Sequence, residues 1–277
     1  MYFLGTWVWN ASIVLITNIA MWAIYTLEIP FFERYKITSD PWPWIDDKVA
    51  WQKLLKKSVL LVSFNNLVTL PLAMLGIVYL NNYEVKLSFA IEDLPDWKTL
   101  MLTLAFCMIC EDLTFHFTHR FLHWRRIYPY IHKIHHTHVV AIGISAEYSH
   151  PLEFMFGNLM PSAVGGLLLG YNMHFTTFFL WQLMRLGETL DGHCGYEFSW
   201  SPYRLIPFST SASYHNFHHS HNIGNYSSFF SLWDTVFGQN KAYFQYYERM
   251  RDETERNKQK KAEFNKLLSE KLKNEGT

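Results

Sequence analysis

Three apolar stretches of this chain, at residues 2–27, 58–80 and 100–117, are long enough to cross a membrane. About 20 largely apolar residues span the hydrocarbon core of a bilayer as a helix. A fourth stretch, residues 154–181, contains Pro161 and the pair Gly165 and Gly166, which fit either one span or a broken, re-entrant hairpin. Only 17% of the residues are charged, below the roughly 25% usual in soluble proteins. The sequence therefore predicts an all-α integral membrane protein with three to four transmembrane helices.

Basic residues near the ends of these stretches predict the orientation of the chain. The connection at residues 28–57 carries six lysines and arginines, whereas the connection at residues 81–99 carries two. Because cytosolic connections are enriched in lysine and arginine, the first should be cytosolic and the second lumenal. Residues 1–27 lack the basic start and cleavage site of a signal peptide, so we expect a retained span. The formal net charge is zero, which implies no global attraction to nucleic acid.

All fourteen histidines lie between residues 116 and 221, and eight of them form three closely spaced clusters. Residues three and four apart share one face of a helix, so each cluster can direct two or three imidazoles at a common point. Eight imidazoles exceed the needs of one tetrahedral zinc, and neutral imidazole also binds iron, copper and nickel. We therefore predict a helical, histidine-rich domain that holds two metal ions and faces the cytosol. The expected ligands are His119 and His123, then His132, His135 and His136, and finally His215, His218 and His219.

Two further histidines, His193 and His150, either complete the coordination of the metals or only form hydrogen bonds in the site. His116 shares a helix face with His119, so it suits either a ligand or a residue that supports one. The remaining histidines are most simply interpreted as polar groups at an interface: His138, His174 and His221.

Carboxylates supply the other ligands in soluble di-iron bundles, which use Glu-x-x-His motifs with further glutamates. Only Glu147 and His150 have that spacing here, which disfavours a carboxylate-rich site. Acidic residues near the histidines are better placed to accept hydrogen bonds from ligand imidazoles and so fix their tautomers. These residues are Glu111, Asp112, Glu147, Glu188 and Asp191.

With these motifs the chain resembles the fatty acid hydroxylase superfamily, membrane enzymes that carry the patterns HxxxH, HxxHH and HxxHH in this order. Within it, the chain is most similar to sterol 4-methyl oxidases. The matching residues are 111–112, 119–123, 126–128, 130–136, 146–153, 188–196 and 224–226. The resemblance implies a fatty acid hydroxylase-type catalytic domain at 100–240, which follows the membrane spans and their connections at 1–99. The tail at 241–277 mixes both charge signs at helical density, which predicts a solvated, charged cytosolic helix.

The resemblance also implies cofactors and partners. Two iron ions would activate dioxygen, and zinc can replace iron in purified protein. Electrons would come from NAD(P)H through cytochrome b5 and its reductase or an equivalent carrier, since the chain has no Gly-x-Gly-x-x-Gly motif after a strand. The implied substrate is a sterol whose methyl group passes through an alcohol and an aldehyde to a carboxylate. The implied location is the membrane of the endoplasmic reticulum, although the chain ends without a dilysine or KDEL-type signal.

A sterol needs a largely apolar cavity that leads to the metals. Aromatic and small residues near the histidines suit the wall of such a cavity, and they equally suit ordinary packing. They are Phe154, Phe156, Gly157, Phe178, Phe179 and Trp181.

Other functions stay open at this point. Within the superfamily they are oxidation at another sterol position such as the side chain, sterol desaturation, and hydroxylation of a fatty acid or other lipid. Outside it, the alternative is a histidine-rich membrane metal-binding protein or transporter. Transporters generally hold ions in cavities near the middle of the membrane. The clusters here follow apolar stretches on one side, which favours an enzyme.

Overall fold

Side-chain caps determine where two of the membrane helices begin. Asp47 accepts hydrogen bonds from the backbone of Val49 and Ala50, and Asp96 accepts one from the backbone of Thr99. Such caps satisfy backbone N–H groups that have no partner in the first turn of a helix. In the computed structural model, which describes residues 2–82 and 84–275, both helices therefore begin before the apolar stretches that the sequence marked.

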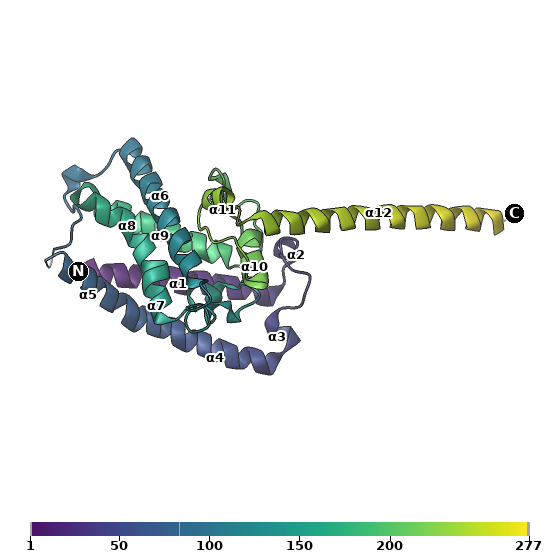
Figure 1. The fold of residues 1–277 in the computed structure, drawn as a ribbon, viewed down its shortest axis with the longest axis horizontal. Helices are drawn as coiled ribbons and strands as arrows, with labels where there is room; N and C mark the ends of the chain where they lie inside the picture. Colours follow the sequence, from purple (N-terminus) through teal and green to yellow (C-terminus); the bar gives the residue numbers. More distant parts are fainter. Residues whose placement is uncertain (1, 83, 276–277) are drawn as a thin grey trace.

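Helices dominate the described residues, which contain no strand and only isolated β-bridges (Figure 1). The longer helices are α1 (Tyr2–Leu27), α4 (Lys48–Phe64), α5 (Leu70–Leu80), α6 (Trp97–Leu122), α8 (Met160–Leu169), α9 (Phe175–Gly192), α10 (Ala212–His221) and α12 (Lys241–Glu275). The shorter helices are α2 (Pro30–Glu33), α3 (Pro43–Asp46), α7 (Pro151–Glu153) and α11 (Leu232–Phe237). Two π-helical segments, Asn65–Thr69 and Phe154–Leu159, join α4 to α5 and α7 to α8.

Four helical stretches are long and apolar enough to cross a membrane. They are Phe3–Leu27, Lys48–Leu80, Trp97–Leu122 and Pro151–Asn172. The predicted fold class, an all-α protein with several membrane-spanning helices and a histidine-rich region, is confirmed.

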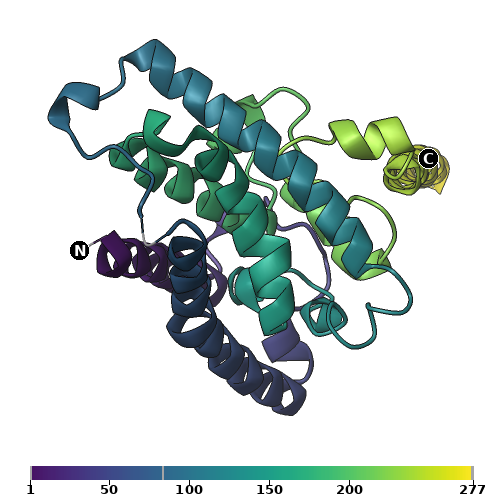
Figure 2. The ribbon, with the colours of Figure 1, turned by 60° about the vertical axis from the view of Figure 1, so that its left-hand side comes forward.

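The fourth apolar stretch belongs to a helical hairpin whose turn lies beyond the predicted breakers. α8 ends at Gly170, which has a φ of +54°, and the His174 side chain caps the start of α9. Pro161 lies directly after the π-helical segment Phe154–Leu159, near the start of α8. Gly165 lets α8 approach α6, because a Cβ there would lie 2.8 Å from the Cys107 Cα atom. Residues 154–169 therefore form one helical segment beside α6 (Figure 2), and residues 175–181 of the stretch belong to the returning α9.

Two β-bridges show which connections meet at each end of the bundle. Ser88 pairs with His174, so the connection after α5 lies beside the turn between α8 and α9. Lys36 pairs with Tyr196, so the connection after α1 lies beside the segment that follows α9. We call the first the far end and the second the histidine end. At the second end α10 lies near α2 (Figure 1): Ser213 N on α10 donates to Glu197, whose own N–H donates to the Tyr35 carbonyl.

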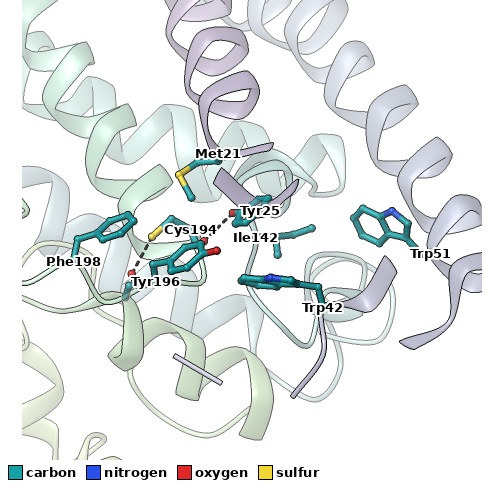
Figure 3. Close-up of a cluster of buried hydrophobic side chains, with 9 residues drawn as sticks. Met21, Tyr25, Trp42, Trp51, Ile142, Cys194, Tyr196 and Phe198 are labelled. Atoms are coloured by element: carbon teal, nitrogen blue, oxygen red, sulfur yellow. Dashed lines mark hydrogen bonds between the residues drawn. The ribbon is translucent and has the colours of Figure 1, made fainter. Parts of the chain in front are cut away.

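An aromatic cluster at the histidine end holds the segment that follows His193 (Figure 3). Its labelled members are Met21, Tyr25, Trp42, Trp51, Ile142, Cys194, Tyr196 and Phe198. The Tyr25 ring stacks on Tyr196 with centroids 5.8 Å apart, and its hydroxyl donates to the Cys194 carbonyl at 2.8 Å. Gly195 has a φ of +75°, and a Cβ there would lie 2.9 Å from the Trp42 ring. This packing fixes the backbone directly after His193.

The C-terminal helix α12 projects from the bundle (Figure 1). Its side chains at residues 248–265 are exposed, and Lys258 pairs with Glu255 at 2.8 Å. This part of the tail is the solvated, charged helix that the mixed charges predicted. Residues 276–277 lie outside the described residues.

Candidate metal centre

Nine imidazoles from α6, residues 132–136, the end of α9 and α10 converge in two groups. The first group is His119, His123, His132, His136 and His218. The second group is His135, His193, His215 and His219. Each ring offers one nitrogen as a ligand atom, and within each group these nitrogens all lie within 4.8 Å of one another. The groups are adjacent, since the rings of His136 and His219 have centroids 4.9 Å apart.

The adjacent histidines of each HxxHH motif belong to different groups. His136 lies in the first group and His135 in the second, and His218 and His219 divide in the same way. On α10 consecutive residues are about 100° apart around the helix axis, so the imidazoles of His218 and His219 diverge. As expected, each HxxHH motif directs two imidazoles at a common point: His132 and His136 at the first group, and His215 and His219 at the second. Each of these motifs contributes to both groups.

The distances between ring nitrogens fit coordination of a metal ion. In the first group, His132 Nε2 lies 3.1 Å from His119 Nε2 and 3.1 Å from His136 Nε2. In the second group, His193 Nε2 lies 2.9 Å from His215 Nε2. Two imidazole nitrogens that are each about 2.0–2.1 Å from one metal lie about 3 Å apart when they occupy neighbouring positions. The residues of both groups therefore fit a bound transition metal.

The opposite nitrogens of six rings are hydrogen-bonded to acceptors, which fixes the tautomers. Nδ1 of His132 donates to Glu153 Oε1 at 2.7 Å. The other five Nδ1 atoms donate to backbone carbonyls: His119 to Tyr226, His135 to Tyr148, His193 to Thr189, His218 to Gly224, and His219 to His138. A carbonyl only accepts, so these rings carry their proton on Nδ1 and direct the Nε2 lone pair at their neighbours. Converging lone pairs repel one another, and a shared cation stabilises them.

Burial keeps these imidazoles neutral. It lowers the pKa of His135 to about 4. The pKa values of His193, His215 and His219 also fall well below the usual range, through burial first and then through neighbouring imidazoles. Loss of solvation disfavours the charged imidazolium. Neutral imidazole is the form that binds a metal.

A loop at residues 222–230 carries two of the carbonyl acceptors and is held by two buried carboxylates. Asp234 on α11 accepts a hydrogen bond from the Tyr226 backbone at 3.0 Å. Asp112 on α6 accepts one from the Ser228 backbone at 3.1 Å. The Tyr226 carbonyl in turn accepts from His119 at 2.9 Å. Asp112 was expected to accept a hydrogen bond from a ligand imidazole. It instead holds the loop whose Tyr226 carbonyl accepts that bond.

Three of the predicted imidazole partners are bound by arginines. Glu111 and Glu188 pair with Arg185 at 2.5 and 2.9 Å, and Asp191 pairs with Arg204 at 2.6 Å. Buried carboxylates need a counter-charge because an unpaired charge is costly to bury. Their predicted hydrogen bonds with ligand imidazoles do not form in the described structure.

Glu147 bonds to an asparagine and not to an imidazole, and a different glutamate contacts the imidazoles. Glu147 Oε2 accepts from Asn66 Nδ2 at 2.6 Å. Glu153, which the prediction missed, is the carboxylate that accepts from His132. An acidic residue at the start of an apolar stretch is costly at membrane depth, and this signal could have identified Glu153.

The other histidines lie outside both groups. The His150 ring accepts from the Leu152 backbone at 3.1 Å, which caps α7, so the structure does not bring this expected ligand to the others. His116 is buried with Nδ1 3.2 Å from Ser227 Oγ. His138 is buried rather than interfacial, with Nε2 2.9 Å from Ser58 Oγ. His174 is buried as the cap of α9, and His221 is exposed.

Two cavities adjoin beside the imidazoles. A cavity of about 40 Å³ is lined by histidines of both groups, including His119 and His135. A second cavity of about 180 Å³ lies between α1, α5, α8 and α9, and its wall follows α5 from Leu70 to Asn81. The residues that line both are Ala146, Asn158, Arg185 and Thr189. The larger cavity therefore runs from the far end to the wall of the metal centre.

The predicted cavity residues divide between several places. Phe154, Phe178 and Trp181 line the larger cavity, and Gly157 lines the smaller one. Phe156 is exposed, and the Phe179 ring packs against Trp9 with centroids 5.8 Å apart.

The family model for fatty acid hydroxylases matches residues 104–239, which include all nine imidazoles. Methylsterol monooxygenase 1 of Gallus gallus is 36% identical over 221 residues, or 80% of this chain and 71% of the relative. The protein of the same name from Rattus norvegicus is 38% identical over 80% of this chain and 72% of its own. Methylsterol monooxygenase 2-1 of Arabidopsis thaliana is 31% identical over 87% and 88%. No solved structure matches the chain significantly. The chain therefore belongs to the fatty acid hydroxylase family, as its motifs predicted, with methylsterol monooxygenases among its relatives.

Proposed function

We propose that this protein is a membrane oxygenase that oxidises a sterol methyl group, with a methyl group on sterol ring carbon C4 as its target. The observation that carries the proposal is the pair of neutral imidazole groups at the end of a mostly apolar cavity. The names of the animal and plant relatives support the substrate class.

The imidazoles suit two iron ions, one in each group. Five rings would hold the first ion and four the second. Iron bound in this way supplies the activation of dioxygen that oxidation of an unreactive C–H bond requires. Imidazole accepts zinc as well, so zinc is expected to replace iron in overproduced protein.

The reductant comes from outside the chain in this proposal. NAD(P)H supplies electrons through cytochrome b5 and its reductase or an equivalent carrier. The histidine end lies on the cytosolic side of the endoplasmic reticulum membrane, where these partners can reach it. Six lysines and arginines at residues 28–57, against two at residues 81–99, support this orientation.

The larger cavity suits a substrate that arrives from the bilayer. Its wall on α5 presents Leu70, Met74 and Ile77 on one helix face. A rigid sterol body would lie along these helices with its methyl group beside the wall shared with the metal centre. The apolar walls exclude water, which protects the reacting groups from side reactions.

Sterol profiling by mass spectrometry tests the proposal. Cells that lack this protein should accumulate a sterol that keeps an additional methyl group, and the intact chain should clear it. His135→Ala removes a ligand of the second group and should fail to clear it. His221→Ala changes an exposed histidine outside both groups and should clear it normally. Purified active protein should hold two metal ions per chain, and His135→Ala should hold fewer.

Other outcomes would indicate a different activity. Unchanged sterols together with altered hydroxylated or unsaturated fatty acids would indicate a lipid hydroxylase or desaturase. A sterol altered only in its side chain or double bonds would indicate oxidation at another position. Metal transport without oxygen consumption would indicate a transporter.

A further inference from the structure

The larger cavity has a polar corner that the imidazole groups do not use. We propose that Glu147, held by Asn66 and Asn10, binds the hydroxyl group of the sterol and thereby selects the ring carbon whose methyl group is oxidised. The inference rests on the proposed function, because it takes a sterol as the ligand of this cavity.

Three buried polar side chains form a hydrogen-bonded chain across the membrane helices. Asn10 Nδ2 on α1 donates to Asn66 Oδ1 at 2.9 Å, and Asn66 Nδ2 donates to Glu147 Oε2 at 2.6 Å. The indole of Trp7 donates to the Asn66 carbonyl at 2.8 Å. Asn10, Asn66 and Glu147 are all buried. One oxygen of the Glu147 carboxylate is therefore held in a fixed position.

The backbone segment that carries Asn66 also positions these three side chains. Asn66 lies in the π-helical segment Asn65–Thr69, and such segments occur frequently at functional sites. Asn65, in the same segment, donates from Nδ2 to the Ser149 carbonyl at 2.9 Å. The two neighbouring asparagines therefore hold both the side chain of Glu147 and the backbone beside it.

This corner contains a carboxylate and a buried hydroxyl. Glu147 and Asn10 both line the larger cavity, and the hydrogen bond from Asn66 engages Oε2 of the Glu147 carboxylate. Thr6, one turn before Asn10 in the same wall, has a buried Oγ1 atom without a partner in the described part of the chain. Buried polar groups are usually hydrogen-bonded, so a ligand hydroxyl suits this position.

The position of Glu147 connects the hydroxyl site to the metal centre. The next residue, Tyr148, accepts the Nδ1 proton of His135, and the preceding residue, Ala146, lines both cavities. In a sterol the hydroxyl-bearing ring carbon is a direct neighbour of C4. A hydroxyl that donates to Glu147 Oε1 therefore places the C4 methyl groups near the shared wall. Because the ring system is rigid, this one hydrogen bond orients the whole substrate.

Binding of two matched sterols tests the inference. The probes are a 4,4-dimethylsterol and the same sterol with its hydroxyl replaced by hydrogen, measured on metal-loaded protein without reductant. The wild type should bind the hydroxyl sterol about tenfold or more tightly, because a site built for a hydroxyl discriminates against a ligand that lacks one. Glu147→Leu should bring the ratio of the two affinities close to one. Asn66→Leu should lower the ratio by a smaller factor.

Asn18→Leu is the matched control and should keep the wild-type ratio. Asn18 also lies on α1, but its Nδ2 donates to the Val14 carbonyl of its own helix, and it lines neither cavity. If Glu147→Leu does not fold, Glu147→Ala decides, since alanine removes both carboxylate oxygens and adds no bulk. It should lower the ratio.

Two results would overturn the inference: equal binding of both sterols by the wild type, or an unchanged ratio in a folded Glu147 variant. Turnover after reductant is added tests the proposed function separately. A wild type that prefers the hydroxyl sterol but oxidises neither sterol would support the hydroxyl site and reject the oxidation.

Discussion

Six of the nine imidazoles at the metal centre are oriented through the nitrogen that faces away from the neighbouring rings. The sequence could predict eight of the nine histidines, because they lie three or four residues apart in three clusters, whereas it left the role of His193 open. It could not predict the acceptors of their Nδ1 protons. Five of these six acceptors are backbone carbonyls, which every residue has, so no side chain marks them.

Glu153→Ala should weaken metal binding without removing a ligand. Glu153 fixes the His132 ring through a 2.7 Å hydrogen bond, and loss of such a partner typically lowers metal affinity about 10–100-fold. Glu153→Gln keeps an acceptor and should lose less. Metal retained after dialysis against a graded series of chelators measures the effect. Glu263→Ala on the exposed part of α12 is the control, and equal retention in it and Glu153→Ala would contradict the assignment.

Buried histidines should make the metal-free protein less stable in acid. Burial lowers the pKa of His135 from 6.5 to about 4 and that of His138 from 6.5 to about 3. Below pH 6.5 the unfolded chain binds protons at these residues and the folded chain does not, so stability is full above pH 6.5 and is lost as the pH falls toward the folded values. Each such histidine contributes about 1.4 kcal/mol per pH unit in that window.

The unfolding temperature of metal-free protein at about pH 7.5 and about pH 5.5 checks this expectation. The midpoint should be lower in acid, and His138→Gln should reduce the difference. A midpoint that rises on acidification would show that these rings are already charged in the folded chain.

At the scale of helices, the sequence predicted which segments are apolar but not where each helix ends. The start of α4 at Lys48 depends on the cap Asp47, which lies well before the apolar stretch. The turn of the hairpin begins at Gly170, where the backbone takes a positive φ, whereas Gly165 allows α8 to pack closely on α6. The π-helical segments have no periodicity that a sequence reveals, yet one of them places Asn66 beside Glu147.

Gly165→Ala should loosen the contact between α6 and α8. Its Cβ would lie 2.8 Å from a backbone atom of Cys107, and overpacking of this kind typically costs about 1–3 kcal/mol. Gly76→Ala on α5 is the matched control, since a Cβ there meets nothing within 4 Å. Alanine also has the higher helix propensity, so Gly76→Ala should keep or raise the unfolding temperature in detergent. Equal midpoints for the two variants would show that α8 can move away freely.

For the whole molecule, the two β-bridges show which connections lie at the same end of the helix bundle. The Lys36–Tyr196 bridge joins the lysine-rich connection to the segment after His193, and the Ser88–His174 bridge lies at the opposite end. The imidazoles and the lysine-rich connection therefore share one side. The basic residues predict that this side is cytosolic.

Epitope tags test the orientation in sealed microsomes whose cytosolic face is outward. Tags near Asp40 and after α12 should be accessible to antibody, and a tag near Asp93 should be protected until detergent is added. Protection of the first two tags with access to the third would invert the orientation. Detergent-treated vesicles, in which every tag should react, are the control.

The division of adjacent histidines between two groups determines which changes in chain length the protein can tolerate. One residue inserted between His215 and His218 on α10 would rotate the following imidazoles by about 100° and direct them away from their groups. Residues between motifs, such as 154–192, form whole helices and turns, so their length can change at the turn after α8 without altering the phase of any motif. Relatives that keep the activity should therefore vary in length between the motifs and never within them.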